Sequence, residues 1–241
     1  MFKPTPHTMR LALKEKRKIY GVFLSGPSPE IMEIASTLKE IQYFYVDGEH
    51  GMFDLNEVES CVRAAEAVDL PIIARVPDHM NETIQRYLDR GVRAIVASHM
   101  SDVATAERVA KACRYFPRGT RSFGSARANR FGFYDGDRVA HMKAVNDDLL
   151  VCATIEDVEG VRNLDALLKV DGIDAWSIGP SDLSMSLGYP GQFDHPAVKK
   201  IFDEVYAKID ASGKFNRDKY MVSIRDKIAL RDGLKKAIAA G

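Results

Sequence analysis

The sequence predicts an α/β protein built from repeated strand–helix units. Short apolar runs alternate with amphipathic segments along almost the whole chain, which is the pattern of a repeated βα fold. The apolar runs are rich in Val, Ile and Leu, as parallel strands are when both faces of their sheet are covered. A chain of 241 residues suits one large domain. We therefore expect a single domain over residues 1–241.

The first unit begins with the strand Ile19–Leu24. Its helix is expected to start at Pro29, because Ser28 can cap it, proline is favoured at the first helical position, and Glu30 lies in the first turn. Later strands are expected at 43–46, 72–76, 94–97, 149–154, 175–178 and 220–224. Helices are expected from about 55 and 81, at 103–113 and 160–168, from 196, and at 229–240.

Seven strands fit two architectures. The count is one short of an eight-stranded barrel, and an open doubly wound sheet fits equally well. No GxGxxG sequence follows the first strand, where GVFLSGPSP stands instead, so dinucleotide binding has little support. The segment 117–134 (PRGTRSFGSARANRFGFY) is the one long irregular stretch. Long loops inside compact domains are usually functional or mobile, and this basic loop is either solvated or in contact with an anionic substrate.

Composition excludes several classes of protein. The 34 Lys and Arg residues balance 34 Asp and Glu residues, which argues against a nucleic-acid binder. No apolar run of about 18 residues predicts a membrane span, and the N-terminus lacks the apolar stretch of a secretory signal. The three cysteines show no metal-binding spacing, so we expect a reduced, cytoplasmic setting.

Polar residues gather where the expected strands end. In a parallel barrel, chemistry collects at the carboxyl ends of the strands. These ends carry the segments DGEHG (47–51), RVP (75–77), SH (98–99), TIE (154–156) and GPSD (179–182). A base, a cation and two carboxylates should therefore lie on one face.

Each of these residues also has a purely structural interpretation. Glu156 and Asp182 can each favour the N-terminus of the helix that follows, yet together they form the oxygen pair that Mg²⁺ takes in proteins. For His50 taken alone, a surface histidine is the simpler interpretation. Arg75 ends an apolar strand, so its guanidinium must be either ion-paired or facing substrate. The remaining histidines at strand ends and loops, His79, His99 and His195, are expected to be structural.

Six motifs in order carry a family resemblance: YVDGEHG, IIARVP, YLDRG, PRGTRSFG, TIEDVEGVRNLD and GIDAWSIGPSDLSMSLGYPG. The chain resembles the HpcH/HpaI aldolase family over roughly residues 21–198, and again at its C-terminus. The resemblance implies a (β/α)8 barrel of the TIM type and a class II pyruvate aldolase. Such an enzyme reversibly cleaves 4-hydroxy-2-oxo acids into pyruvate and an aldehyde.

The resemblance also implies roles for single residues. Glu156 and Asp182 match the ligands of a divalent metal, which the sequence does not identify among Mg²⁺, Mn²⁺ and Co²⁺. His50 matches the acid/base and Arg75 the group that stabilises the enolate. Two further matches are Asp89, the carboxylate that pairs with the histidine, and Ser181 with Asp182, the turn whose backbone amides hold the pyruvate carboxylate.

The chain departs from the family pattern in two places. Thr154 stands where the family usually has a substrate-binding Gln, two residues before the metal-binding Glu. After Gly213 the seventh strand and helix are apparently missing or truncated, and about twenty residues seem to be absent. Because strand number, tilt and stagger are linked in a barrel, we expect a gapped barrel, a seven-stranded closure, or a missing segment that residues 214–219 bridge.

Two alternatives to the aldolase remain at this point. An acyl-CoA lyase of the citrate lyase β or malyl-CoA type would share Glu156, Asp182 and Arg75, but the DGEHG motif favours the aldolase. A barrel that only binds a 2-oxo acid or another chain would explain Thr154 and the short seventh unit. The presence of His50, Arg75 and Asp89 together argues against it.

The last expectations concern the aldehyde substrate and the oligomeric state. Phe23, at the end of the first strand, and the loop residues Arg121 and Arg127 are candidate contacts for a small, polar or carboxylated aldehyde. Apolar residues recur at steps of three and four in 229–240, which indicates an apolar stripe on the last helix. The resemblance implies hexamers built from dimers, with the segment 225–241 exchanged between subunits.

Overall fold

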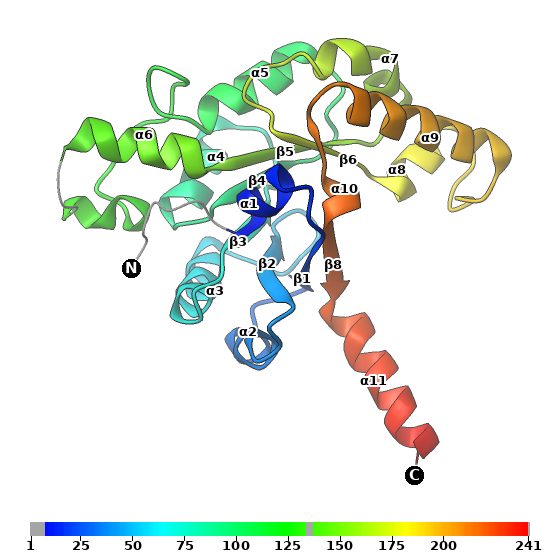
Figure 1. The fold of residues 1–241 in the computed structure, drawn as a ribbon, viewed down its shortest axis with the longest axis horizontal. Helices are drawn as coiled ribbons and strands as arrows, with labels where there is room; N and C mark the ends of the chain where they lie inside the picture. The colour runs from blue at the N-terminus through cyan, green and yellow to red at the C-terminus, as the bar shows by residue number, and fades with distance from the viewer. Residues whose placement is uncertain (1–7, 134–136, 241) are drawn as a thin grey trace.

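The computed structural model describes residues 8–133 and 137–240. Within them, parallel strands form one curled sheet in the order β7-β6-β5-β4-β3-β2-β1-β8 (Figure 1). The strands are β1 (Ile19–Leu24), β2 (Ile41–Asp47), β3 (Ile72–Arg75), β4 (Ala94–Ala97), β5 (Leu150–Ile155), β6 (Ala175–Ile178), β7 (Phe215–Asn216) and β8 (Met221–Arg225). The expected α/β class and repeated βα order are confirmed.

Helices alternate with the strands; most pack on the outside of the sheet, but the first covers one end of the curl and the last extends away from it. They are α1 (Thr8–Lys14), α2 (Pro29–Ser36), α3 (Leu55–Ala67), α4 (Asn81–Asp89), α5 (Val103–Ala112), α6 (Arg138–Asp148), α7 (Val158–Leu167), α8 (Pro180–Ser186), α9 (Pro196–Ala211), α10 (Arg217–Tyr220) and α11 (Asp226–Ala240), with a 3-10 helix η1 (Arg127–Gly132). No described helix has the length and apolar character that a membrane span requires.

Aspartates begin several of the helices that follow strands. Asp102 and Asp157 accept hydrogen bonds from the first-turn backbone amides of α5 and α7. Asp54 does the same for α3, where Glu57 reciprocates in a capping box. Each cap satisfies an N–H that has no partner within its helix. Ser28 stands at the N-cap of α2 as expected, but its side chain makes no capping hydrogen bond.

Buried residues form two layers, one on each side of the sheet. The outer cluster joins the sheet to its helices. The inner cluster fills the curl with residues that point inward, among them Tyr43, Tyr45 and Cys152. Met9 and Leu13 of α1 are fully buried in that same cluster. Because the cluster also holds residues from the beginnings of the strands, α1 covers the amino-terminal end of the barrel.

The seventh unit is present in a reduced form. Strand β7 has two residues and the following α10 has four. Ladder pairing joins β7 to β6 and β8 to β1, while α10 contacts both β6 and β8. Of the three expectations for this region, a gapped barrel fits best, since β7 and β8 are the two edges of the described sheet and α10, not ladder pairing, links them.

Four of the described α-helices were not expected from the sequence. Helix α6 occupies part of the interval between β4 and β5, α8 follows β6 directly, α10 lies between β7 and β8, and α1 precedes β1. The described residues 117–133 of the expected irregular loop contain no strand, but they contain η1. Its last residue, Tyr134, lies outside the described residues.

Candidate active site

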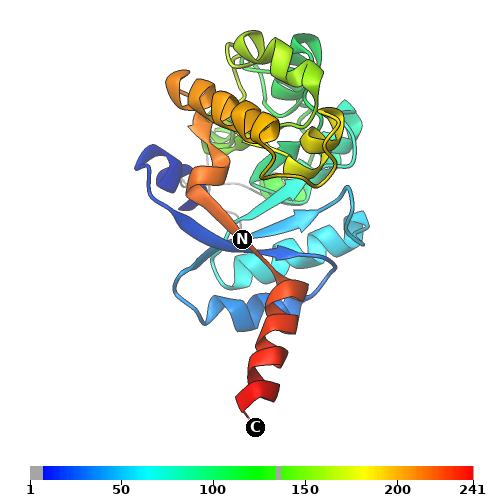
Figure 2. The same cartoon turned by 90° about the vertical axis from the view of Figure 1, so that its right-hand side faces the viewer.

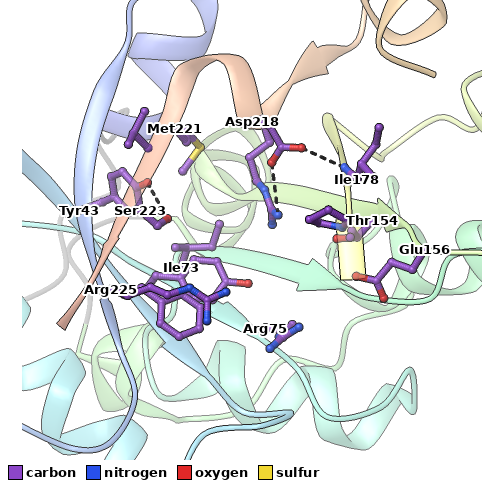
Figure 3. A pocket seen from close by; sticks show the side chains of 16 residues that line it. Tyr43, Ile73, Arg75, Thr154, Glu156, Ile178, Asp218, Met221, Ser223 and Arg225 are labelled. Carbon is purple, nitrogen blue, oxygen red and sulfur yellow. Dashed lines mark hydrogen bonds and ion pairs between the residues drawn. The ribbon is translucent and has the colours of Figure 1, made fainter. Parts of the chain in front are cut away.

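A cavity of about 360 Å³ opens at the carboxyl ends of the strands (Figure 3). Four of the expected site residues line it: Phe23, Arg75, Thr154 and Glu156. They come from β1, β3, β5 and the end of β5. The parallel sheet explains this meeting, because the carboxyl ends of parallel strands lie at one edge.

Arg75 is held in place by acidic side chains on the neighbouring strand. Its Nε and Nη2 donate to the two carboxylate oxygens of Asp47 at 2.7 and 2.5 Å. Its Nη1 lies 3.1 Å from Glu49 Oε2. Burial acts to raise the pKa of Asp47, but the hydrogen bonds and charge of Arg75, with backbone N–H groups of His50 and Glu49, hold that pKa below its usual range. Arg75 is therefore both ion-paired and on the cavity wall.

Glu156 is the most deeply placed acid of the site. The residue is only 5% exposed. Its Oε2 accepts a hydrogen bond from the backbone N–H of His99 at 3.1 Å and lies 3.0 Å from His99 Nδ1. Burial raises the pKa of Glu156; the nearby His99 opposes this shift, while the negative charges of Asp182 and Glu49 add to it.

Gly179 makes room for this carboxylate. A Cβ at that position would collide with Glu156 Oε1 and with the end of its side chain. Gly179 follows β6 and is the N-cap of α8, so the turn that leads to Ser181 and Asp182 packs directly on Glu156. The small residue is required here because two strand ends approach closely.

The oxygen donors fit a hard divalent cation. Asp182 lies in the first turn of α8 and is close enough for its charge to act on Glu156. Two converging carboxylates, one of them buried, are unfavourable without a positive partner, and Mg²⁺ commonly binds through one or two carboxylates and water. In the described parts of the chain no three His, Cys, Asp or Glu side chains form a complete ligand set, so water and substrate would supply the other positions.

Thr154 and Phe23 shape the remaining wall. The hydroxyl of Thr154 accepts a hydrogen bond from Ser177 Oγ at 3.1 Å and is buried beside β6. Phe23 stacks on Tyr45 with ring centroids 4.8 Å apart, and the Arg225 guanidinium lies 5.0 Å from its ring centre. Phe23 and Tyr45 therefore give the cavity an aromatic portion.

His50 and Ser181 lie outside the cavity wall. His50 is exposed on the loop after β2, where its backbone N–H donates to Asp47 at 3.3 Å. Ser181 is exposed in the first turn of α8. Both lie at the same edge as Glu156, but neither lines the pocket itself.

Three residues to which the sequence analysis gave roles at the site make other side-chain contacts within the described residues. Asp89 Oδ1 accepts a hydrogen bond from Arg121 Nη2 at 2.9 Å. Arg121 is 7% exposed and also stacks on the Tyr115 ring, so it supports the fold. Arg127 pairs with Glu66 at 2.5 Å. The described part of this segment, 117–133, folds back on the outer helices, so both arginines lie away from the cavity.

Sequence reasoning missed two residues of this region. His99 was expected to be structural, yet its ring bridges Glu156 and Glu49, with Nε2 lying 3.1 Å from Glu49 Oε1. It has a positive φ of 49°, which few non-glycine residues adopt. Arg217 of α10 also lines the cavity. The end of β4 was a visible signal for His99, whereas nothing in the sequence placed Arg217.

Comparisons with known proteins agree with this geometry. Residues 19–241 match the family described as HpcH/HpaI aldolase/citrate lyase. A 4-hydroxy-2-oxovalerate aldolase of Novosphingobium aromaticivorans is 34% identical over 221 residues, which cover 90% of this chain and 82% of that protein. A 2-keto-3-deoxy-L-rhamnonate aldolase of Klebsiella pneumoniae is 35% identical over 197 residues, covering 80% and 72%. The crystal structure of an HpcH/HpaI aldolase from Desulfitobacterium hafniense has a TM-score of 0.88 at 24% identity, covering 98% of this chain and 96% of that one.

Proposed function

The chain belongs to the HpcH/HpaI aldolase/citrate lyase family, and from this we propose that it reversibly cleaves 4-hydroxy-2-oxo acids into pyruvate and an aldehyde. The observation that carries the proposal is the meeting of Arg75 and Glu156 on one cavity wall, with Asp182 beside Glu156. A fixed cation, together with an acid pair that can hold a metal ion, can stabilise the enolate that forms from a 2-oxo acid.

We propose Glu156 and Asp182 as the ligands of a divalent metal ion. Such an ion, when bound, would act as a Lewis acid that lowers the cost of forming negative charge on a 2-oxo acid. The buried, negatively charged surroundings of Glu156 support this assignment. Oxygen ligands accept several hard ions, so Mg²⁺, Mn²⁺ and Co²⁺ are all candidates.

Side chains of the protein would accept the proton of the substrate hydroxyl and stabilise the negative charge of the enolate. In cleavage, His50 accepts the proton of the C4 hydroxyl, the C3–C4 bond breaks, and C4 becomes the aldehyde carbonyl. The bonding electrons pass into the enolate of pyruvate, whose oxygen gains negative charge. Arg75, oriented by Asp47, presents a fixed positive charge to this oxygen. Return of the proton to C3 completes pyruvate, and histidine suits both transfers.

We propose that residues at the same end of the barrel also bind the substrate. The backbone amides of Ser181 and Asp182 lie in the first turn of α8, where N–H groups lack helical partners, and would bind the pyruvate carboxylate. Thr154 and Phe23 would contact the rest of the substrate. Asp89 would support the site only indirectly, through its ion pair with Arg121.

We also propose that the protein is a homo-oligomer whose last helix packs on a neighbouring subunit. Helix α11 runs away from the body of the barrel (Figures 1 and 2), and none of its described residues is buried. Its apolar side chains are 46 to 79% exposed; they are Ile228, Leu230, Leu234 and Ile238. A partner subunit would cover this stripe.

Metal removal tests the proposed function. Exhaustive chelation should abolish pyruvate release from a 4-hydroxy-2-oxo acid, and Mg²⁺, Mn²⁺ or Co²⁺ should restore it, because the two carboxylates need a positive partner for chemistry. Glu156→Gln should lose the restored activity while keeping its thermal unfolding temperature. Full activity after chelation would contradict the metal-dependent assignment.

The proton carrier is tested by comparing two histidines at this edge. His50→Asn should lower kcat by about 100-fold or more, as expected when a general acid/base is removed. His99→Asn should act mainly through the position of Glu156, which its ring contacts, and should weaken metal binding. If His99→Asn abolishes turnover and His50→Asn leaves kcat unchanged, the role of acid/base belongs to His99.

A further inference from the structure

The loop after β2 carries a carboxylate that the mechanism above does not use. Glu49 follows the end of β2, and its side chain is only 15% exposed. One of its oxygens, Oε2, lies 3.1 Å from Arg75 Nη1. The other oxygen, Oε1, lies 3.1 Å from His99 Nε2. Glu49 therefore joins two neighbouring strand ends, because Arg75 ends β3 and His99 follows β4.

The backbone at His99 is fixed on both sides. His99 has a φ of 49°, which few non-glycine residues adopt. The carbonyl before it accepts a hydrogen bond from His79 Nε2 at 2.8 Å. The N–H after it donates to the Thr154 carbonyl at 3.0 Å. This turn places the His99 N–H 3.1 Å from Glu156 Oε2.

The ring of His99 is oriented by two carboxylates. Its side chain is 51% exposed, so packing alone does not fix the ring. Nδ1 lies 3.0 Å from Glu156 Oε2, while Nε2 faces Glu49. Only one orientation of the ring gives both nitrogens these partners. Glu49 therefore selects the orientation in which the ring contacts Glu156.

Glu49 is in turn tied to the cation of the site. Asp47 orients Arg75 through hydrogen bonds to Nε and Nη2, and Nη1 of the same guanidinium contacts Glu49. A chain of contacts thus runs from Arg75 through Glu49 and His99. It ends at Glu156, and both ends of the chain line the cavity (Figure 3). One connected set of side chains therefore places both the enolate cation and the proposed metal ligand.

We propose that Glu49 is a positioning residue for the metal-binding carboxylate, acting on Glu156 through the ring of His99. This inference rests on the proposed function and extends it to a residue that does not line the cavity. With Glu156 Oε2 engaged by His99, Oε1 is the oxygen left for a cation. Groups that orient a metal ligand in this way typically change metal affinity by about 10- to 100-fold when they are removed.

Binding of Mn²⁺, measured by electron paramagnetic resonance, tests the proposal without turnover. Glu49→Gln should raise the Kd for Mn²⁺ by about 10-fold or more. The charge of Glu49 also acts on Glu156 directly, so Glu49→Asp is the matched variant: it keeps the charge, but its shorter side chain cannot span both contacts. Glu49→Asp should weaken binding by a similar factor. Native affinity in Glu49→Asp would overturn the inference, because charge alone would then explain the loss in Glu49→Gln.

A double-mutant cycle shows whether the effect passes through His99. Glu49→Gln combined with His99→Asn should raise the Kd by no more than about twofold beyond the larger single effect, since both changes remove the same contact. Effects that multiply would mean that Glu49 does not act through the ring. Glu159→Gln is the control, because it removes an exposed charge in the first turn of α7, at the same edge of the barrel. It should change the Kd by less than about twofold.

The same titration separates this inference from the proposed function. If Glu156→Gln abolishes Mn²⁺ binding and both Glu49 variants bind as the intact protein does, the role of Glu49 fails alone. If the intact protein does not bind Mn²⁺, or binds it equally well after Glu156→Gln, the proposed metal site fails and the inference fails with it. Thermal unfolding of each variant checks that the barrel stays folded.

Discussion

At the scale of single residues, the site depends on Gly179, which has no side chain and so leaves room for the carboxylate of Glu156. The Glu156 carboxylate occupies the space that a Cβ on Gly179 would fill. The same turn leads into Ser181 and Asp182. One methyl group at this position would therefore disturb both proposed metal ligands at once.

Gly179→Ala should lower kcat/KM by about 10- to 100-fold, because small displacements of catalytic groups are costly. The added methyl group displaces Glu156 rather than changing its chemistry, so a higher metal concentration should recover part of the loss. Steady-state kinetics against metal concentration measures this. Gly124→Ala is the matched control, since a Cβ there meets no atom within 4 Å. Normal metal affinity and turnover in Gly179→Ala would show that Glu156 can move without consequence.

At the scale of elements, the shortened seventh unit is held by side chains as well as by the two-residue ladder between β7 and β6. Asp218 of α10 accepts hydrogen bonds from the backbone of β6 and from Tyr206 of α9. Burial raises the pKa of the Tyr206 phenol, and the charge of Asp218 and the hydrogen bond to it raise that pKa further. These contacts substitute for part of the hydrogen bonding that a full seventh strand would provide.

Asp218→Ala should lower the free energy of unfolding by about 1 to 3 kcal/mol, because it leaves a backbone N–H and a phenol without their acceptor. Hydrogen exchange should speed up at 215–220. Asp210→Ala is the control: that carboxylate pairs with Lys219 on the surface, where ion pairs contribute about 0 to 1 kcal/mol. Equal effects of the two substitutions in urea unfolding would contradict a special role for Asp218.

At the scale of the whole molecule, α11 is the helix whose apolar side chains stay exposed in a single chain. The other amphipathic helices bury at least one face against the sheet or a neighbour, but α11 extends from the end of β8 beyond the barrel (Figure 2). Exposed apolar stripes of this kind are typical of interfaces. The edge position of β8 adds to this, since β8 pairs with β1 only among the described strands.

Light scattering on the intact chain should therefore give the mass of an assembly, and a chain ended at Ile224 should give smaller species. Leu234→Glu combined with Ile238→Glu should dissociate the assembly as well, since both side chains are more than half exposed. Lys227→Glu and Arg231→Glu on the same helix change the charge without touching the apolar stripe and should leave the mass unchanged. A monomer for the intact chain would exclude the helix exchange.

Much of the fold and part of the site follow from local sequence. Apolar runs such as Ile19–Leu24 and Ala94–Ala97 mark strands because burial on both faces demands continuous apolar side chains. Residues just after such runs, such as Glu156 and Asp182, share one edge because parallel strands end together. The sequence motifs indicated the family and, through it, the proposed chemistry. These inferences need only the order of residues along the chain.

Tertiary structure decided the contacts between distant segments. Arg121 meets Asp89 across 32 residues, and His99 reaches Glu156 across 57, because loops fold back by geometry that no local pattern encodes. Arg217 enters the cavity only because the seventh unit is short and α10 lies between β6 and β8. Whether a charged side chain is paired, exposed or turned toward substrate depends on how the barrel closes. That closure is a property of all the strands together, so the sequence alone could not assign it.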